Sequence, residues 1–183
     1  GVEGLNEFSR YFYPQLDKEG LIIDDRANGG GNVSPMILER LSREPYRLTM
    51  RRGSARIGTV PDAVQVGPKV CLINKYSASD GDLFPWGFRA LGLGKLIGTR
   101  TWGGIVGISG SLPYMDGTDI RVPFFTSFDP KTGNWIIENQ GVDPDILIDN
   151  DPVKEWNGED QQLDRAIQEV MKELQNRKPL PGV

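Results

Sequence analysis

The fold is decided by two stretches of sequence, GLIIDDRANGGGN at residues 20–32 and KVCLINKYSASDGDLF at residues 69–84. Each opens with an apolar run of strand length that stops at polar residues. Each then passes through a loop of small residues into a segment with helical spacing, near 34–42 in the first case and near 83–94 in the second. A strand that leads through a tight loop into a helix, twice in one chain, predicts an α/β domain.

Further elements are predicted on both sides of these two units. Helical spacing of apolar residues predicts a helix at 4–16, and KLIGTR predicts a strand at 95–100. Residues 47–67 are basic and irregular, which predicts a hairpin or a mobile excursion. Antiparallel strands are predicted around the turn at 115–118, and a further pair around NWIIENQ at 134–140.

The C-terminal part is predicted to form a helix at 159–175. Its apolar positions make a single stripe, which predicts packing against the core of the domain rather than a partner site. The Pro-rich residues 179–183 are predicted to fray. One lobe is therefore expected over residues 1–178. The stripe consists of Leu163, Ala166, Ile167, Val170, Met171 and Leu174.

The composition describes a soluble globular chain. The 183 residues carry 25% charged residues and a net charge of −4, with Lys and Arg scattered along the chain, so neither nucleic acid nor an anionic membrane is an expected partner. No apolar run approaches the roughly 18 residues that cross a bilayer, and the first residues form no signal peptide.

The cysteine and histidine counts limit the chemistry of the chain. Cys71 is the only cysteine and histidine is absent, which excludes disulfides and the usual Cys and His zinc sites within these residues. No metal or cofactor is expected. The commonest general base in enzymes is also missing, so base catalysis would need a group from outside this sequence.

Ser79 is the candidate nucleophile. It lies between the end of the strand at 69–75 and the following helix, where its hydroxyl would face the positive end of the helix dipole. The unpaired N–H groups of that first turn, beginning with Asp80, can stabilise an oxyanion. A second donor would come from Gly29, Gly30 or Gly31, because glycine lets the backbone approach a substrate closely.

Plainer interpretations of these motifs stay open on the residues alone. A Ser-Asp pair before a helix is commonly an N-cap, and three glycines after a strand are commonly a turn. The glycines do not bind nucleotides in a known pattern, because no Gly-Lys-Ser/Thr follows them and the GxGxxG spacing is absent.

The motifs taken together resemble the tricorn proteases and C-terminal processing peptidases, which share a core with the Clp protease and crotonase superfamily. The resemblance covers nearly the whole chain. It implies a Clp protease/crotonase-like α/β fold of repeated strand-strand-helix units, in a chain that is one fragment of a longer polypeptide. The matching motifs are EFSRYF, GLIIDDRANGGGN, NKYSASDGDLF, IGTRTWGG, ENQGVDPDI and QLDRAI.

The resemblance also implies roles for individual residues. In the processing-peptidase branch the nucleophile stands three residues before an acidic residue that opens the helix. The resemblance matches this relation to Ser79 and Asp82, and so implies that Ser79 rather than Ser77 is the nucleophile. That branch places a lysine base where this chain has Gly104. The departure points to the tricorn branch, in which an earlier lobe supplies a histidine. There a glutamate matching Glu138 orients the histidine through an intervening serine.

The function implied by the resemblance is hydrolysis of peptide bonds through an acyl-enzyme on Ser79. The N–H groups of Asp80 and Gly30 would hold the oxyanion, with Gly29 and Gly31 as further candidates. The chain alone is expected to be nearly inactive, because its base is elsewhere. Expected partners are a peptide substrate, the upstream lobe and further copies of the polypeptide, in the cytoplasm by analogy, with a periplasmic or secreted location still open.

Two other classes of function remain. A crotonase-like acyl-CoA enzyme would use the two backbone N–H groups on a thioester carbonyl without a serine nucleophile. A catalytically silent scaffold or binding module would keep the fold alone. Neither predicts covalent labelling of Ser79 by an active-serine probe.

Overall fold

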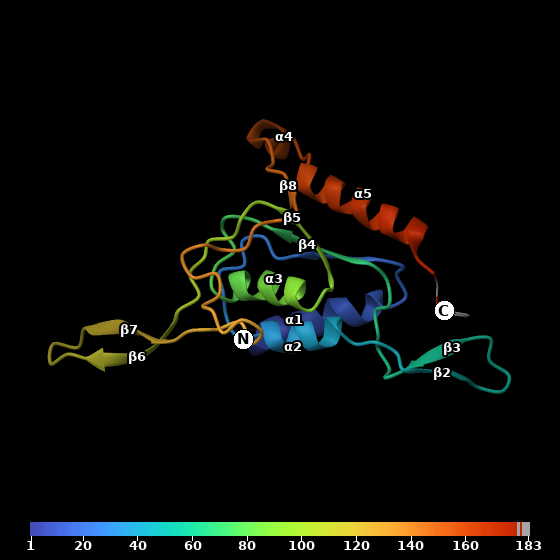
Figure 1. The fold of residues 1–183 in the computed structure, drawn as a ribbon, viewed down its shortest axis with the longest axis horizontal. Coiled ribbons are helices and arrows are strands. Elements are labelled where there is room, and N and C mark those ends of the chain that lie inside the picture. Colours follow the sequence, from blue (N-terminus) through green and yellow to red (C-terminus); the bar gives the residue numbers. More distant parts are fainter. Residues whose placement is uncertain (179, 181–183) are drawn as a thin grey trace.

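A parallel four-stranded sheet forms the centre of the protein, in the order β1-β4-β5-β8 (Figure 1). The structure is a computed structural model that describes residues 1–178 and 180, with the backbone alone for residues 109–112. The predicted frayed tail at 179–183 therefore lies outside the described residues except for Leu180. The strands of this sheet are β1 (Leu21–Asp24), β4 (Lys69–Ile73), β5 (Gly94–Gly98) and β8 (Ile146–Leu147).

Helices cover both faces of the sheet (Figure 1). β4 is buried along its whole length because its side chains alternate between two apolar clusters. Cys71 and Ile73 pack against α1, α2 and α3 on one face, and Val70 and Leu72 pack against α5 on the other. The helices are α1 (Val2–Phe12), η1 (Tyr13–Gln15), α2 (Ser34–Leu41), α3 (Asp80–Ala90), α4 (Pro152–Trp156) and α5 (Gln161–Asn176).

Two antiparallel hairpins extend from this body in different directions (Figure 1). One joins β2 (Arg47–Met50) to β3 (Ile57–Val60), so the hairpin prediction for 47–67 is confirmed. The other joins β6 (Gly107–Pro113) to β7 (Asp119–Phe125) across the predicted turn at 115–118. Neither hairpin pairs with the central sheet among the described residues.

The strand pair predicted around 134–140 is wrong. Only an isolated bridge between Trp135 and Phe128 forms there. Ile137 and Asn139 have φ values of 27° and 59°, and the N–H groups of Gln140 and Gly141 both donate to the Ile137 carbonyl. A backbone that turns this tightly cannot continue a strand.

The stripe on α5 packs on the core only in part. Ala166 and Val170 are buried against the sheet, whereas Ile167 and Met171 are 46% and 55% exposed. The prediction of a fully packed stripe is therefore wrong for its outer half. The reason is that α5 turns Gln162 and Glu169 inward and buries them, so its buried face is rotated from the purely apolar one.

Candidate active site

Ser79 occupies a strained turn between β4 and α3. Its φ of 57° and ψ of −114° lie outside the regions that non-glycine residues ordinarily adopt. The turn is held from both sides, because the Ser79 N–H donates to Asp82 Oδ2 at 2.9 Å and the Ala78 N–H donates to the Asn28 carbonyl at 2.8 Å. The sequence places a small hydroxyl residue where the chain reverses sharply at the start of a helix.

Asp82 holds this turn against a second loop, residues 101–106. Its side chain is fully buried, and each oxygen accepts a backbone N–H from that loop. Asp82 Oδ1 accepts from Gly103 at 2.7 Å, and Oδ2 accepts from Gly104 at 3.1 Å. With Ser79, three N–H donors satisfy the one buried carboxylate.

Glu138 binds the next two N–H groups of the same loop. Its Oε2 accepts from Ile105 at 2.6 Å and from Val106 at 2.9 Å. The Asn139 N–H returns a bond to the Gly103 carbonyl at 2.7 Å. Four consecutive amides of the loop 101–106 are thus shared between Asp82 and Glu138, and this loop connects the predicted nucleophile to the predicted supporting glutamate.

The glycine loop, residues 29–31, lies beside the nucleophile. A Cβ atom placed on Gly30 would stand 2.7 Å from Ser79 Cβ and 3.1 Å from Ser79 Oγ, and Gly30 has a φ of 112°. No larger residue fits this approach. The Gly30 N–H donates to Asn28 Oδ1 at 3.0 Å. Within the described part of the chain, the N–H groups of Gly29 and Gly31 have no such acceptor.

Asp80 ties the far end of the glycine loop to the nucleophile helix. Its Oδ2 accepts from the N–H groups of Val33 and Ser34 at 2.8 and 3.0 Å, so the side chain caps α2 rather than its own helix. Its backbone N–H has no acceptor among residues 1–178 and 180. An N–H that stands free beside a hydroxyl is the arrangement that an oxyanion requires.

Ser77, two residues from Ser79, has a structural contact. Its side chain is fully buried, and its Oγ donates to the Asp25 carbonyl at 2.8 Å. That bond joins the nucleophile loop to the end of β1. The distinction between Ser77 and Ser79 that the sequence predicted is consistent with this burial.

Gly104 lies under the ring of Trp102. A Cβ atom on Gly104 would collide with that ring. Trp102 itself is 68% exposed. A lysine at this position would have to displace the indole. The place that the processing-peptidase branch gives to its base is thus occupied by a different side chain.

Sequence reasoning missed Asp25 and Asn28. Asp25 is 6% exposed, and burial raises the pKa of its carboxyl to about 8, opposed by the hydrogen bond from Asn28 and reinforced by Asp80, Asp24 and Asp82. The available signal was a second acidic residue directly after the apolar run of β1. It could not reveal that one carboxylate turns outward and the other inward.

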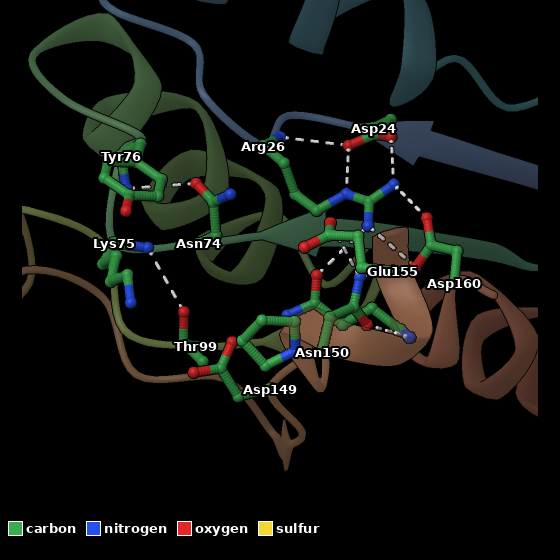
Figure 2. Close-up of a pocket in the computed structure, with 12 residues that line it drawn as sticks. Asp24, Arg26, Asn74, Lys75, Tyr76, Thr99, Asp149, Asn150, Glu155 and Asp160 are labelled. Carbon is green, nitrogen blue, oxygen red and sulfur yellow. Dashed lines mark hydrogen bonds and ion pairs between the residues drawn. The ribbon is translucent and has the colours of Figure 1, made fainter. Parts of the chain in front are cut away.

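A polar pocket of about 510 Å³ lies at the carboxyl ends of the parallel strands, apart from these residues (Figure 2). Figure 2 shows Arg26 between Asp24 and Asp160. Its Nη2 lies 2.6 Å from Asp24 Oδ2 and 2.8 Å from Asp160 Oδ2. The Arg26 guanidinium lowers the pKa of Asp160 to about 2. None of the predicted catalytic or oxyanion residues lines this pocket.

Two searches of the described residues were negative. No group of three or more Cys, Asp or Glu side chains there has an arrangement suited to a metal ion. None of the helices described combines the length and apolar character needed to cross a bilayer.

Comparison with known proteins gives consistent matches. The family model "Peptidase family S41" matches residues 3–148. The tricorn protease of Thermoplasma volcanium is 43% identical over 181 residues, which cover 97% of this chain and 17% of that protein. A putative tricorn-like protease C-terminal subunit of Sulfurisphaera tokodaii is 39% identical over 175 residues, covering 96% of this chain and 20% of that protein.

A solved structure agrees with these matches. The crystal structure of the tricorn protease superposes with a TM-score of 0.88 at 42% identity, over 96% of this chain and 17% of that one. The predicted resemblance and the predicted fold class are therefore confirmed. The chain spans about a sixth of the length of these relatives.

Proposed function

This chain belongs to peptidase family S41, and on that premise we propose that it carries the nucleophile of a serine peptidase. Ser79 is the acylated residue. The supporting observation is the strained turn that sets Ser79 against Gly30, next to the Asp80 N–H, which has no acceptor among the described residues. This arrangement supports the assignment of one nucleophile and two oxyanion donors.

In the proposed reaction, Ser79 Oγ attacks the carbonyl carbon of the scissile peptide while a base takes its proton. The carbonyl oxygen becomes an oxyanion held by the Asp80 N–H and a glycine-loop N–H. Collapse of this intermediate breaks the C–N bond, and the base returns the proton to the leaving amine. Water then attacks the acyl-enzyme by the same route and frees Ser79.

The second oxyanion donor is proposed to be Gly30, the glycine closest to Ser79. Its N–H would donate both to its present acceptor, Asn28 Oδ1, and to the oxyanion. Gly29 and Gly31 are the further candidates, and their N–H groups carry no such bond within the described residues.

The base is proposed to be a histidine from an upstream lobe of the same polypeptide. The chain contains no histidine, and its relatives are several times longer. Glu138 would orient that histidine through an intervening serine. In support, the two described amides that bind Glu138 both donate to Oε2, and no bond to Oε1 is found within the described part of the chain.

The wider assignment follows from the same resemblance. We propose that residues 1–178 are one lobe of a longer polypeptide that acts on peptides, assembles with further copies of itself and works in the cytoplasm. Cross-linking of the full-length protein followed by mass spectrometry would test the assembly.

The first test is covalent labelling. Full-length protein treated with a fluorophosphonate should gain one adduct by intact mass, and Ser79→Ala should abolish it, because among the described residues no other serine has a positive φ. Ser54→Ala, at an exposed hairpin turn, is the matched control and should label like wild type. The 183-residue chain, tested in parallel, should label little, because it lacks the base.

The opposite outcome is equally informative. A folded full-length protein that gains no adduct would contradict the proposal and favour a silent binding module or a crotonase-like acyl-CoA enzyme. Adduct formation that survives in Ser79→Ala would place the nucleophile elsewhere.

A further inference from the structure

We propose, resting on the function proposed above, that Asp25 is a positioning residue that acts as a neutral acid and holds the glycine loop against Ser79 through Asn28. The inference concerns a buried carboxyl group that takes no direct part in the chemistry. It follows from four contacts.

Asp25 is built into the sheet at the end of β1. Its N–H donates to the Leu72 carbonyl at 2.9 Å, and its own carbonyl accepts from Ser77 Oγ at 2.8 Å. The backbone of Asp25 is therefore fixed by β4 and by the nucleophile loop together. Its side chain has little freedom to leave the interior.

Asn28 connects this carboxyl group to the glycine loop. Its Nδ2 donates to Asp25 Oδ1 at 2.9 Å, and its Oδ1 accepts the Gly30 N–H at 3.0 Å. The Gly30 N–H can only donate, so the amide oxygen must face it and the amide nitrogen must face Asp25. Asp25 Oδ1 is therefore an acceptor, and a proton on this carboxyl group resides on Oδ2.

Asp25 Oδ2 is buried and has no hydrogen-bond partner in the described part of the chain. The titratable groups around it are Asp24 on β1, Cys71 on β4, and Asp80 and Asp82 on α3. All four can only be neutral or negative. A carboxylate at this place would be a buried anion without a cationic partner among acidic groups. Burial first, and then Asp80, Asp24 and Asp82, therefore raise the pKa of Asp25 to about 8.

Ionisation of Asp25 would act on the site in two ways. It would add negative charge to the region in which the oxyanion forms, and that charge opposes the transition state. It would also repel Asp80 and Asp82, whose carboxylates hold the glycine loop and the nucleophile turn. Ser79 should therefore react fastest while Asp25 is protonated.

The experiment is the pH dependence of Ser79 labelling in the full-length protein. The second-order rate with a fluorophosphonate should fall about tenfold from pH 7 to pH 9 in wild type, as expected when only the neutral form of a group with a pKa of about 8 is competent. Asp25→Asn keeps a neutral acceptor for Asn28, so its rate should stay level over this range. Asp17→Asn makes the same change at an exposed position and should retain the fall.

A second variant tests the connection itself. Asn28→Ser removes the amide nitrogen that donates to Asp25 and leaves only a short hydroxyl facing the Gly30 N–H. Labelling should fall about tenfold or more at every pH, because the glycine loop is no longer tied to Asp25 and loses its register with Ser79. Tryptophan fluorescence at each pH verifies that all variants remain folded. If Asp25→Asn did not fold, Asn28→Ser would still test whether Asp25 holds the glycine loop.

The outcomes separate this inference from the proposed function. An alkaline fall that persists in Asp25→Asn, a wild-type rate that does not fall, or an Asn28→Ser variant that labels as fast as wild type would each overturn the role of Asp25 alone. Absence of labelling in wild type at any pH would instead overturn Ser79 as nucleophile, and the role of Asp25 with it.

Discussion

Asp82 and Asp25 are two buried carboxyl groups beside the same serine, and their surroundings differ. Asp82 is fully buried and accepts three backbone N–H groups, from Ser79, Gly103 and Gly104. Asp25 is 6% exposed and accepts one side-chain donor, and its Oδ2 has no partner among the described residues. The number of donors, rather than the depth of burial, therefore decides what a buried carboxyl group does.

The largest loss of stability from a substitution is expected where the satisfied group is removed. Asp82→Ala leaves three backbone donors without their acceptor, which should destabilise this region by roughly 3 kcal/mol or more. Hydrogen exchange of peptides covering residues 101–106 should accelerate strongly in the full-length protein. Labelling of Ser79 should fall with it, because the turn loses its anchor.

Asp116→Ala is the matched control for Asp82. Asp116 also accepts a backbone N–H, from Thr118, but it stands on an exposed hairpin turn. Unchanged exchange in Asp82→Ala, or an equal change in both variants, would mean that the three backbone donors of Asp82 do not set its importance.

The next effect concerns stability as a function of pH. The pKa of Asp25 is about 8 in the folded chain against 3.8 when unperturbed, so between these values the folded chain holds a proton that the unfolded chain has released. The contribution of Asp25 should therefore lower the free energy of unfolding by about 1.4 kcal/mol for each pH unit from about pH 4 to about pH 8. Outside that window Asp25 adds no slope.

Asp25→Asn should remove this slope. The variant should gain stability relative to wild type as pH rises toward 8, and the gain should vanish near pH 4. Urea titrations followed by hydrogen exchange of peptides from β1 and β4 would measure the difference. A constant difference across the window would show that Asp25 is ionised when folded and would break the contrast with Asp82.

The smallest effect is expected at a carboxylate that is neither deep nor unpaired. Asp160 pairs with Arg26 and accepts the Leu163 N–H at the start of α5. Because this pair is partly exposed, Asp160→Ala should cost only about 1 kcal/mol, measured as faster exchange in the first turn of α5. Asp164→Ala, an exposed residue of the same turn, should change little.

The contribution of Asp160 to stability changes with pH in the opposite direction to that of Asp25. Arg26 lowers the pKa of Asp160 to about 2, so the stabilisation is present above pH 4 and is lost as the pH falls through 2. Asp25 and Asp160 thus limit stability from opposite ends of the pH scale. A wild-type chain that lost stability at neither end would contradict both assignments.

Local sequence determined most of the elements, because their signals are short-range. Apolar runs set β1 and β4, helical spacing set α2, α3 and α5, and the turn at 115–118 set the β6–β7 hairpin. The failure at 134–140 has a specific cause. NWIIENQ has strand-like composition, but contacts of Asn139 and Glu138 with the loop 101–106 turn its backbone into positive φ.

The candidate site divides in the same way. The sequence alone determined that Ser79 opens a helix after a buried strand, that glycines follow the neighbouring strand and that no histidine is present, since these are matters of order along the chain. Only the tertiary structure decided that Asp82 and Glu138 share one loop and that Asp25 faces inward while Asp24 faces Arg26. The physical reason is that burial and hydrogen-bond partners depend on residues brought together from distant parts of the chain, and these determine the charge and the role of each carboxyl group.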